Sequence, residues 1–243
     1  GKRVSAILEK TGGKAESLMP QSKEGILHNS VLFADMTPSE IERLCTLLCA
    51  FERHYQRGRH LISAGDPISG FGLLLAGAIQ VFMDDVDGNH IVMADVSPGS
   101  LFAEAMACAG ITESPITAVA TANTAVLWFH CAPLRDGAFF TDPLCARFGV
   151  NLLRAVSERS LRFNDRIQVL SKKSIREKLI TFFSQQVQQQ KSLQITLNMD
   201  RSTMADYLGV ERTALSRELS RMQRDGILSF HKNRFLLHHA RES

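Results

Sequence analysis

The stretch from Asp200 to Gln223, DRSTMADYLGVERTALSRELSRMQ, constrains the fold of this chain more than any other. It predicts two short helices joined by a sharp turn. The carboxylate of Asp200 can cap a helix over Arg201–Leu208, and Gly209 follows where the chain needs a left-handed residue. Arg212 then begins a second helix. Apolar residues at matching positions predict that the two helices pack as a helix-turn-helix, and they are Met204, Ala205, Leu208, Val210, Leu215 and Leu219.

The second helix has one polar face. At about 100° per residue, Leu215, Leu219 and Met222 fall on one side, and hydroxyl and guanidinium groups fall on the other. Arg217, near the helix start, is the candidate for a bidentate contact to a guanine edge. The alternative is a solvated basic face on an ordinary helix pair. The residues that we expect to contact DNA, a later hairpin included, are Arg212, Thr213, Ser216, Arg217, Arg221, Lys232 and Arg234.

The charge distribution fits this hypothesis. The chain has 243 residues and a net charge of +3. Residues 171–243 hold 13 Lys and Arg against 7 Asp and Glu, whereas residues 1–170 hold 15 against 18. The basic excess therefore lies in the part that contains the helix pair, as phosphate binding requires.

Composition places the chain among soluble proteins. It is 44% hydrophobic and 22% charged, which allows one large or two modest domains. No apolar run approaches the ~20 residues of a membrane span. The N-terminal residues lack the apolar core of a signal peptide, so we expect a cytoplasmic protein with no membrane partner.

The region from about Phe51 to Ala132 has a different pattern. Short apolar runs alternate with turn signals, and Asp87-Gly88 lies where a tight hairpin is expected. This pattern predicts an antiparallel β-sandwich or barrel. The apolar runs are HLIS, FGLLLAG, AIQVFM, HIVMADV, TAVATA and AVLWFH.

A long helix is expected from Asp142-Pro143 onward, since proline suits the first helical position. About 28 residues would make it ~42 Å long. Apolar residues form a stripe along it, which predicts a dimer seam; the alternative is burial against its own β domain. The seam residues are Phe148, Leu152, Val156, Phe163 and Ile167.

Capping signals mark two further helices, at Thr37-Pro38-Ser39-Glu40 and at Ser174-Ile-Arg-Glu177. Short strands flank the helix-turn-helix: LQITL precedes it, and ILSF and RFLL follow it as a wing joined across His231-Lys232-Asn233. The predicted fold class is α+β. The predicted domains are a loose arm at 1–25, an effector-binding β-roll at 26–141, a long dimerisation helix at 142–171 and a winged helix-turn-helix at 172–243.

This order of elements resembles the CRP/FNR family of bacterial transcription regulators over about residues 28–238. The glycines of Gly65-Asp66, Gly77, Asp87-Gly88 and Pro98-Gly99 resemble the family's cyclic-nucleotide-binding roll. LGVERTALSRELSRMQRDGIL resembles its recognition helix and the start of its wing. The resemblance implies a homodimer that binds a palindromic operator in double-stranded DNA, with RNA polymerase as a further partner.

The chain departs from the family at the effector site. Relatives that bind cyclic AMP carry Gly-Glu and, ten residues after the Glu, Arg-Ser, whose Arg pairs with the phosphate. Here Ala103 precedes Glu104, and Ser114-Pro115 replaces Arg-Ser. We therefore expect an unknown small-molecule effector that is not cyclic AMP. Residues that could line its pocket are Leu101, Phe102, Ala103, Glu104, Ser114, Pro115 and Trp128.

No cofactor is identified. The iron–sulfur branch of the family carries a cysteine cluster ahead of the roll, whereas the first cysteine here is Cys45, which disfavours a cluster. The five scattered cysteines also argue against a disulfide framework or a zinc site; we interpret them as packing residues, with thiol sensing as the alternative. Haem is disfavoured because each available histidine reads as a surface or core residue: His54, His60, His90 and His130.

Two other classes of function fit the chain less well. A small-molecule sensor module without DNA function is the alternative, and the basic C-terminal part argues against it. An enzyme is not expected, because the chain has no metal triad, nucleophile elbow or Walker loop.

Overall fold

The computed structural model describes residues 23–84 and 90–238. The chain divides into two compact units, the N-terminal unit Gly1–Val156 and the C-terminal unit Ser157–Ser243. The boundary falls within the longest helix, α4 (Pro143–Leu170). In the described ranges, none of the helices combines the length and the apolar character needed to cross a membrane.

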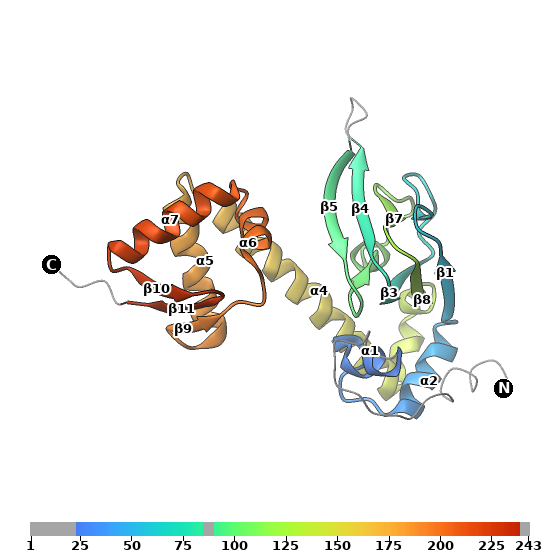
Figure 1. The fold of residues 1–243 in the computed structure, drawn as a ribbon. Helices are drawn as coiled ribbons and strands as arrows, with labels where there is room; N and C mark the ends of the chain where they lie inside the picture. The colour runs from blue at the N-terminus through green and yellow to red at the C-terminus, as the bar shows by residue number, and fades with distance from the viewer. Residues whose placement is uncertain (1–22, 85–89, 239–243) are drawn as a thin grey trace, which may run out of the picture. The chain divides into compact units, whose positions relative to one another are not determined.

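The N-terminal unit is built on two four-stranded antiparallel sheets, as the alternating pattern predicts (Figure 1). One sheet has the order β1-β8-β3-β6 and the other β2-β7-β4-β5. The predicted hairpin at Asp87-Gly88 lies outside the described residues. The strands are β1 (Phe51–Tyr55), β2 (His60–Ile62), β3 (Gly70–Ala76), β4 (Ile79–Asp84), β5 (His90–Val96), β6 (Leu101–Phe102), β7 (Thr117–Ala120) and β8 (Thr124–His130).

Two features hold these strands together. Phe71 of β3 and Phe129 of β8 are paired neighbours in one sheet and are both buried, with ring centroids 5.2 Å apart. Gly77, at the turn after β3, has φ 88°, and a Cβ atom there would lie 2.4 Å from the carbonyl oxygen of Asn123. The turn therefore requires glycine for its backbone conformation and for space.

Three short helices precede the strands. They are α1 (Lys23–Asn29), the 3-10 turn η2 (Val31–Phe33) and α2 (Pro38–Leu47). The expected loose arm at 1–25 is wrong for residues 23–25, which are helical; residues 1–22 lie outside the described ranges. The predicted helix start at Thr37 is confirmed. Its hydroxyl accepts from the backbone N–H of Glu40, whose carboxylate accepts from the backbone N–H of Thr37.

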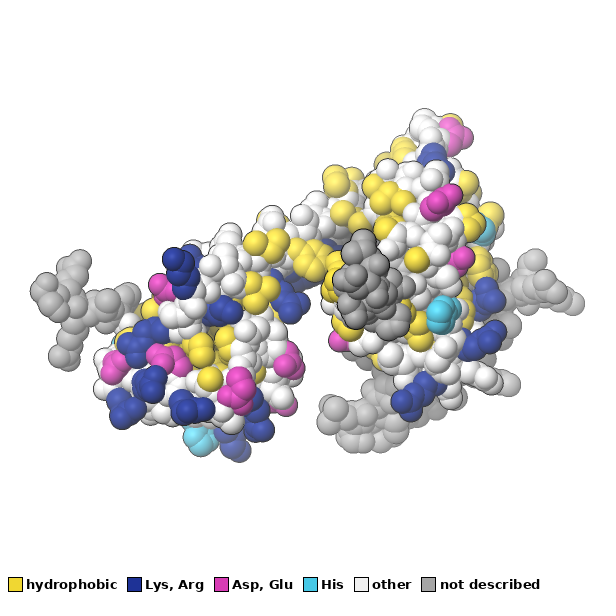
Figure 2. All heavy atoms as spheres, turned by 90° about the horizontal axis from the view of Figure 1, so that it is seen from above, with side chains coloured by type: hydrophobic (Ala, Val, Ile, Leu, Met, Phe, Trp, Pro, Cys, Tyr) yellow, Lys and Arg dark blue, Asp and Glu magenta, His cyan; other side chains and the backbone are white. Residues whose placement is uncertain are grey.

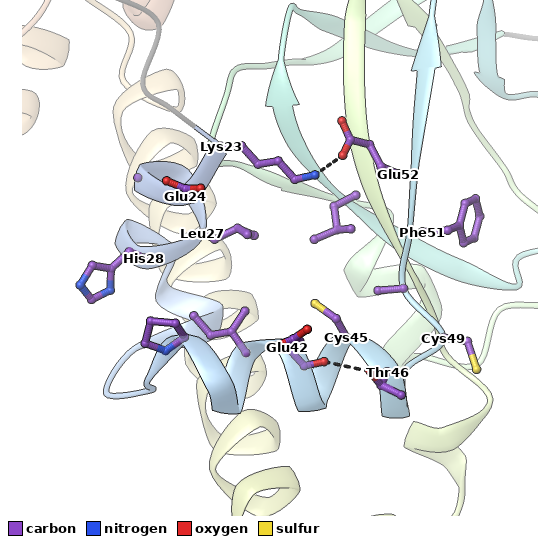
Figure 3. Close-up of a pocket in the computed structure, with 15 residues that line it drawn as sticks. Lys23, Glu24, Leu27, His28, Glu42, Cys45, Thr46, Cys49, Phe51 and Glu52 are labelled. Atoms are coloured by element: carbon purple, nitrogen blue, oxygen red, sulfur yellow. Dashed lines mark hydrogen bonds and ion pairs between the residues drawn. The ribbon is translucent and has the colours of Figure 1, made fainter. Parts of the chain in front are cut away.

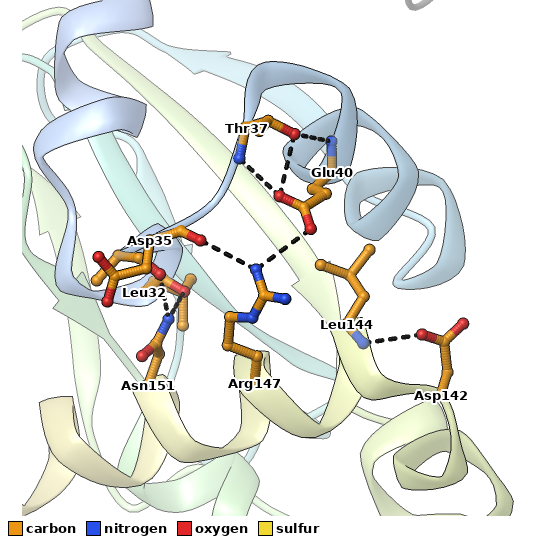
Figure 4. Close-up of polar contacts among 9 residues, drawn as sticks. Leu32, Asp35, Thr37, Glu40, Asp142, Leu144, Arg147 and Asn151 are labelled. Atoms are coloured by element: carbon orange, nitrogen blue, oxygen red, sulfur yellow. Dashed lines mark hydrogen bonds and ion pairs between the residues drawn. The ribbon is translucent and has the colours of Figure 1, made fainter.

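A polar network joins this N-terminal segment to α4 (Figure 4). Arg147 donates to the carbonyl oxygen of Asp35 at 3.0 Å and to the carboxylate of Glu40 at 3.2 Å. Asn151, which is 3% exposed, donates to the carbonyl oxygens of Leu32 and Ala34. Because these carbonyl groups end short turns and lack helical partners, the two side chains supply the donors that they need.

The long helix is confirmed as α4, but part of its predicted seam is wrong. Phe148 and Leu152 are 0% and 6% exposed because they pack into the core of the N-terminal unit. Val156 is partly buried against the same core. Phe163 and Ile167, farther along, are 47% and 62% exposed. The first half of the stripe is therefore part of the core of the N-terminal unit. In the second half, Phe163 and Ile167 remain exposed to solvent.

The C-terminal unit contains the predicted winged helix-turn-helix. Strands β10 and β11 pair as a hairpin, and β9 pairs with β11. Its buried core includes Phe182, Leu208, Leu215 and Phe235. The elements are α5 (Ile175–Gln190), β9 (Gln194–Thr196), α6 (Arg201–Leu208), α7 (Arg212–Arg224), β10 (Leu228–His231) and β11 (Arg234–Leu237). The short elements that remain in the N-terminal unit are α3 (Glu104–Cys108), η3 (Pro133–Arg135) and η4 (Gly137–Thr141).

Candidate nucleic-acid interface and effector site

The turn between α6 and α7 has the predicted local geometry. Asp200 caps α6 by accepting from the backbone N–H of Thr203 at 2.8 Å. Gly209 ends α6 with φ 61°, a left-handed conformation that glycine adopts without strain. Glu211 then caps α7 by accepting from the backbone N–H groups of Thr213 and Ala214. These hydrogen bonds to the charged form lower the pKa of both capping carboxyl groups.

The outer face of α7 carries the residues expected there. Leu215, Leu219 and Met222 are buried in the core of the unit, whereas the predicted contact residues are exposed. Arg217 donates to the carbonyl oxygen and to the hydroxyl of Thr213, at 3.3 and 3.2 Å, so its guanidinium group lies along the first turn of the helix. The exposed residues of this face are Arg212, Thr213, Ser216, Arg217 and Arg221.

Two nearby acidic groups pair with one arginine of an earlier helix. Arg176 of α5 donates to Glu218 at 2.6 Å and pairs with Asp225 at 2.7 Å. Both contacts raise the pKa of the Arg176 guanidinium group. The side chain of Glu218 is only 12% exposed and also forms an ion pair with Arg221 at 3.4 Å. The acids of α7 and its C-terminus are therefore held in ion pairs, which leaves a net positive outer face.

The wing places one predicted basic residue, Lys232, in a tight turn and the other, Arg234, directly after it. His231 pairs with Arg234, so the connection is the two residues Lys232 and Asn233. Lys232 has φ 54°, which is a strained conformation for a residue with a side chain. Asn233 fixes the turn by donating to the carbonyl oxygen of Leu197 at 2.9 Å. Lys232 and Arg234 are both exposed.

Arg201 holds the wing against α6, a role that the sequence did not indicate. Its guanidinium group lies over the rings of Phe230 and Phe235, at 5.1 and 4.9 Å from their centroids. It donates to the carbonyl oxygen of Lys232 at 2.8 Å. Burial lowers its pKa. Only the basic residue at the helix start was visible in the sequence, since its partners lie about thirty positions away.

Lys and Arg side chains gather on the C-terminal unit, as Figure 2 shows. The N-terminal unit provides the contrast. Residues 60–134 contain seven Asp and Glu residues and no Lys or Arg. A phosphate group bound among these strands would meet no guanidinium or ammonium group from that stretch of the chain.

The predicted effector residues fall into two groups. The first group surrounds Phe102, which is buried and packs edge-to-face on Trp128 at 5.1 Å. Glu104, at 2% exposed, begins α3. Ala103 has φ 63°, so the position where relatives carry glycine keeps the left-handed conformation at a cost of about 1–2 kcal/mol. Leu101 is half-buried beside them.

The second group is Ser114-Pro115. The Ser114 hydroxyl donates to the carbonyl oxygen of Ile116 at 2.8 Å and accepts from its N–H at 3.2 Å. Its side chain therefore stabilises the local turn. Pro115 is exposed.

Trp128, which packs on Phe102, donates to the hydroxyl of Tyr55 at 3.0 Å and lines a cavity of only about 150 Å³.

All five cysteines are free thiols. Cys131 and Cys145 are buried, and burial raises the pKa of the Cys145 thiol. Cys49 and Cys108 are exposed. Among the described residues, no group of three or more His, Cys, Asp or Glu side chains is placed to hold a metal ion.

Comparison with known families identifies two domains. The family model described as a cyclic nucleotide-binding domain matches residues 52–131. The model described as a Crp-like helix-turn-helix domain matches residues 177–242. The chain therefore combines a roll of the cyclic-nucleotide-binding type with a helix-turn-helix of the Crp type.

Solved structures agree on the fold. A putative cyclic nucleotide binding protein from Ruegeria pomeroyi is 20% identical, with a TM-score of 0.50 over 88% of this chain and 91% of that one. The c-di-GMP responsive regulator CLP from Xanthomonas campestris is 16% identical, with a TM-score of 0.50 over 84% of this chain and 100% of that one. None of the curated protein sequences matches the chain. At these identities the likeness shows the fold alone.

Proposed function

Because the chain belongs to the CRP/FNR family of DNA-binding transcription regulators, we propose that it acts as a homodimer whose two α7 helices read a palindromic operator. The observation that carries this proposal is the outer face of α7. It exposes Arg212, Thr213, Ser216 and Arg217, while Arg176 holds the neighbouring acids in ion pairs. Arg217 is the base-reading candidate, and Lys232 and Arg234 contact phosphate from the wing.

Dimerisation through α4 is supported by an exposed apolar face that only partly overlaps the predicted stripe. Val150, Leu153, Leu161 and Ile167 are 57% to 66% exposed. At about 100° per residue they lie within roughly 120° of one another, and the positions between them on this face are Ser157, Ser160 and Asn164. A helix face of this kind is stabilised by burial against a second helix. We infer that the seam uses these apolar residues, together with Phe163, in place of Phe148 and Leu152.

The effector in this proposal is not cyclic AMP. The Ser114 hydroxyl is engaged by the backbone of Ile116, and residues 60–134 offer no cation for a phosphate. Burying an unpaired phosphate beside the carboxylate of Glu104 would cost several kcal/mol. Titration calorimetry of the wild-type chain with cyclic AMP should give no saturable heat. A micromolar dissociation constant would contradict this part of the proposal.

In vitro selection from random duplex DNA tests the proposed function. The protein is purified, reduced and free of added ligand. We expect enrichment of an inverted repeat with half-sites about one helical turn apart. Enrichment of a single half-site would contradict the dimer. If the chain fails to bind DNA even at low salt, the alternative of a sensor module without DNA function replaces the proposal. The contact with RNA polymerase that the resemblance implies remains a prediction.

A further inference from the structure

A large groove lies between α1, α2 and the start of β1, away from Phe102, Glu104 and Ser114 (Figure 3). Its volume of about 700 Å³ is within the ~300–1,000 Å³ of small-molecule sites. Leu27 of α1 points into the groove, and Ile41 of α2 and Leu127 of β8 also line it. All of its lining residues belong to the N-terminal unit.

One cysteine in the lining of the groove behaves as an apolar group. Cys45 lines it, and burial raises the pKa of this thiol to about 11, with the nearby Glu42 carboxylate adding to the effect. The thiol therefore stays protonated at neutral pH and acts as a small apolar group. The groove therefore has an apolar interior, to which the Cys45 thiol belongs, suited to the body of a ligand.

The charges around the groove favour one kind of ligand. Its lining includes three carboxylates, Glu24, Glu42 and Glu52, against one lysine, Lys23, and one histidine, His28. Lys23 pairs with Glu52. Within the described part of the chain, Glu24 and Glu42 make no ion pair, so two carboxylates remain unneutralised at the groove. An anionic ligand would be repelled, whereas a cation on an apolar body would be attracted.

We propose that this groove binds an apolar small molecule that carries one cationic group, such as an alkylammonium. The apolar body lies against Leu27, Ile41 and Leu127, and the cation lies near Glu42. The ligand would contact α2, the helix that also carries Glu40 and Arg43, which pair with Arg147 and Asp142. Groove binding does not depend on the proposed DNA function, and either can fail without the other.

The test uses the full chain and three probes that share one alkyl chain: decylamine, decanol and decanoate, each below its micelle concentration. Their displacement of the neutral dye Nile red is followed by fluorescence. We expect decylamine to displace the dye at a concentration ~10-fold or more below that of decanoate, with decanol between them. Glu42→Gln should reduce this preference for the amine and leave decanol unchanged.

Two tryptophan substitutions locate the site. Thr46 is exposed on α2 and lines the groove, so Thr46→Trp should fill the groove and weaken Nile red and decylamine binding ~10-fold or more. Leu47 is 40% exposed on the same helix but lies outside the lining, so Leu47→Trp is the matched control. Circular dichroism checks that both variants fold. Equal displacement by decylamine and decanoate, or unchanged binding by Thr46→Trp, would overturn the proposal.

Discussion

Residues 60–134 of the N-terminal unit and residues 171–243 of the C-terminal unit differ most in how they use charge. The first segment holds seven acids and no Lys or Arg, and the second holds 13 Lys and Arg against 7 acids. In the C-terminal unit most of the acids of residues 171–243 have structural partners. These acids cap helices or pair with Arg176, and they are Glu177, Asp200, Glu211, Glu218 and Asp225.

The difference separates two kinds of ligand. A polyanion is attracted to a surface whose acids are already paired, because its phosphates meet guanidinium groups directly. A phosphate-bearing small molecule finds no such partner among residues 60–134. Each unit therefore selects its ligand by its own local charges.

The first prediction asks whether the basic face alone is sufficient for specific binding. Leu161→Glu places a charge on the proposed α4 seam, where an unpaired carboxylate would be buried. We expect a monomer, and a loss of operator affinity on the order of 100-fold, equivalent to about 3 kcal/mol. Salt-sensitive non-specific binding should remain. Sedimentation equilibrium and fluorescence anisotropy measure the two effects.

Arg162→Glu is the control for this prediction, because it introduces the same side chain one position along and about 100° around the helix. It should leave the dimer intact. Specific binding by a monomeric Leu161→Glu variant at wild-type affinity would show that the charged face of one unit suffices.

The second prediction concerns base reading by the recognition helix. Arg217→Ala should cost about 1–3 kcal/mol on a selected operator and relax the preference at one guanine. Arg217→Lys keeps the charge but loses the planar fork, so it should relax the preference nearly as much. In vitro selection from random duplex DNA, repeated with each variant, measures the base preference at each operator position. An unchanged base preference in Arg217→Ala would assign Arg217 to phosphate contact instead.

Local signals explain what the sequence predicted well. The caps at Asp200 and Ser174 and the left-handed Gly209 depend on residues within a few positions, so they were visible in the sequence. The antiparallel sheets and α4 followed from apolar periodicity. The Crp-like helix-turn-helix could therefore be predicted in detail, down to which α7 residues are buried.

Contacts between distant residues explain what the sequence missed. The partners of Arg201 lie on β10, β11 and their turn. Periodicity alone could not tell whether Phe148 and Leu152 face a partner helix or their own domain, because both require apolar residues. The groove beside α2 is assembled from segments as far apart as Lys23 and Leu127. Such sites depend on the tertiary arrangement.

The third prediction isolates the contribution of wing charge. Lys232→Gly removes the ammonium group and also suits the positive φ of the turn, so the wing should fold at least as well. We expect a modest, uniform loss of affinity across DNA sequences and a decrease of about 1 in the slope of log affinity against log salt. Lys191→Gly is a matched control. Lys191 is also exposed, with φ 50°, but lies outside the predicted interface, so the slope should not change. An equal effect of both variants would contradict a wing contact.

The smallest expected effect follows from the acids that cap helices. Hydrogen bonds lower the pKa of Glu177, Asp200 and Glu211 in the C-terminal unit, and of Glu40 in the N-terminal unit. A carboxyl group whose pKa is lowered by folding stabilises the fold above its unfolded value, about 4, and loses that contribution as the pH falls through its folded value. With three such groups against one, acid should destabilise the C-terminal unit more than the N-terminal unit.

Urea unfolding, followed by two spectroscopic signals, tests whether the C-terminal unit loses stability before the N-terminal unit as the pH falls. The single tryptophan, Trp128, reports on the N-terminal unit, whereas far-ultraviolet circular dichroism reports on the helices of both units. We expect the two transitions to separate as the pH falls below about 4, with the dichroism signal lost first. Asp200→Asn keeps a good N-cap that does not titrate, so it should reduce the separation, whereas Asp200→Ala should weaken α6 already at neutral pH. If the two transitions coincide at every pH, the capping carboxyl groups do not make the acid stability of the two units different. The two units would then differ in the charge of their ligand-binding surfaces and not in their stability toward acid.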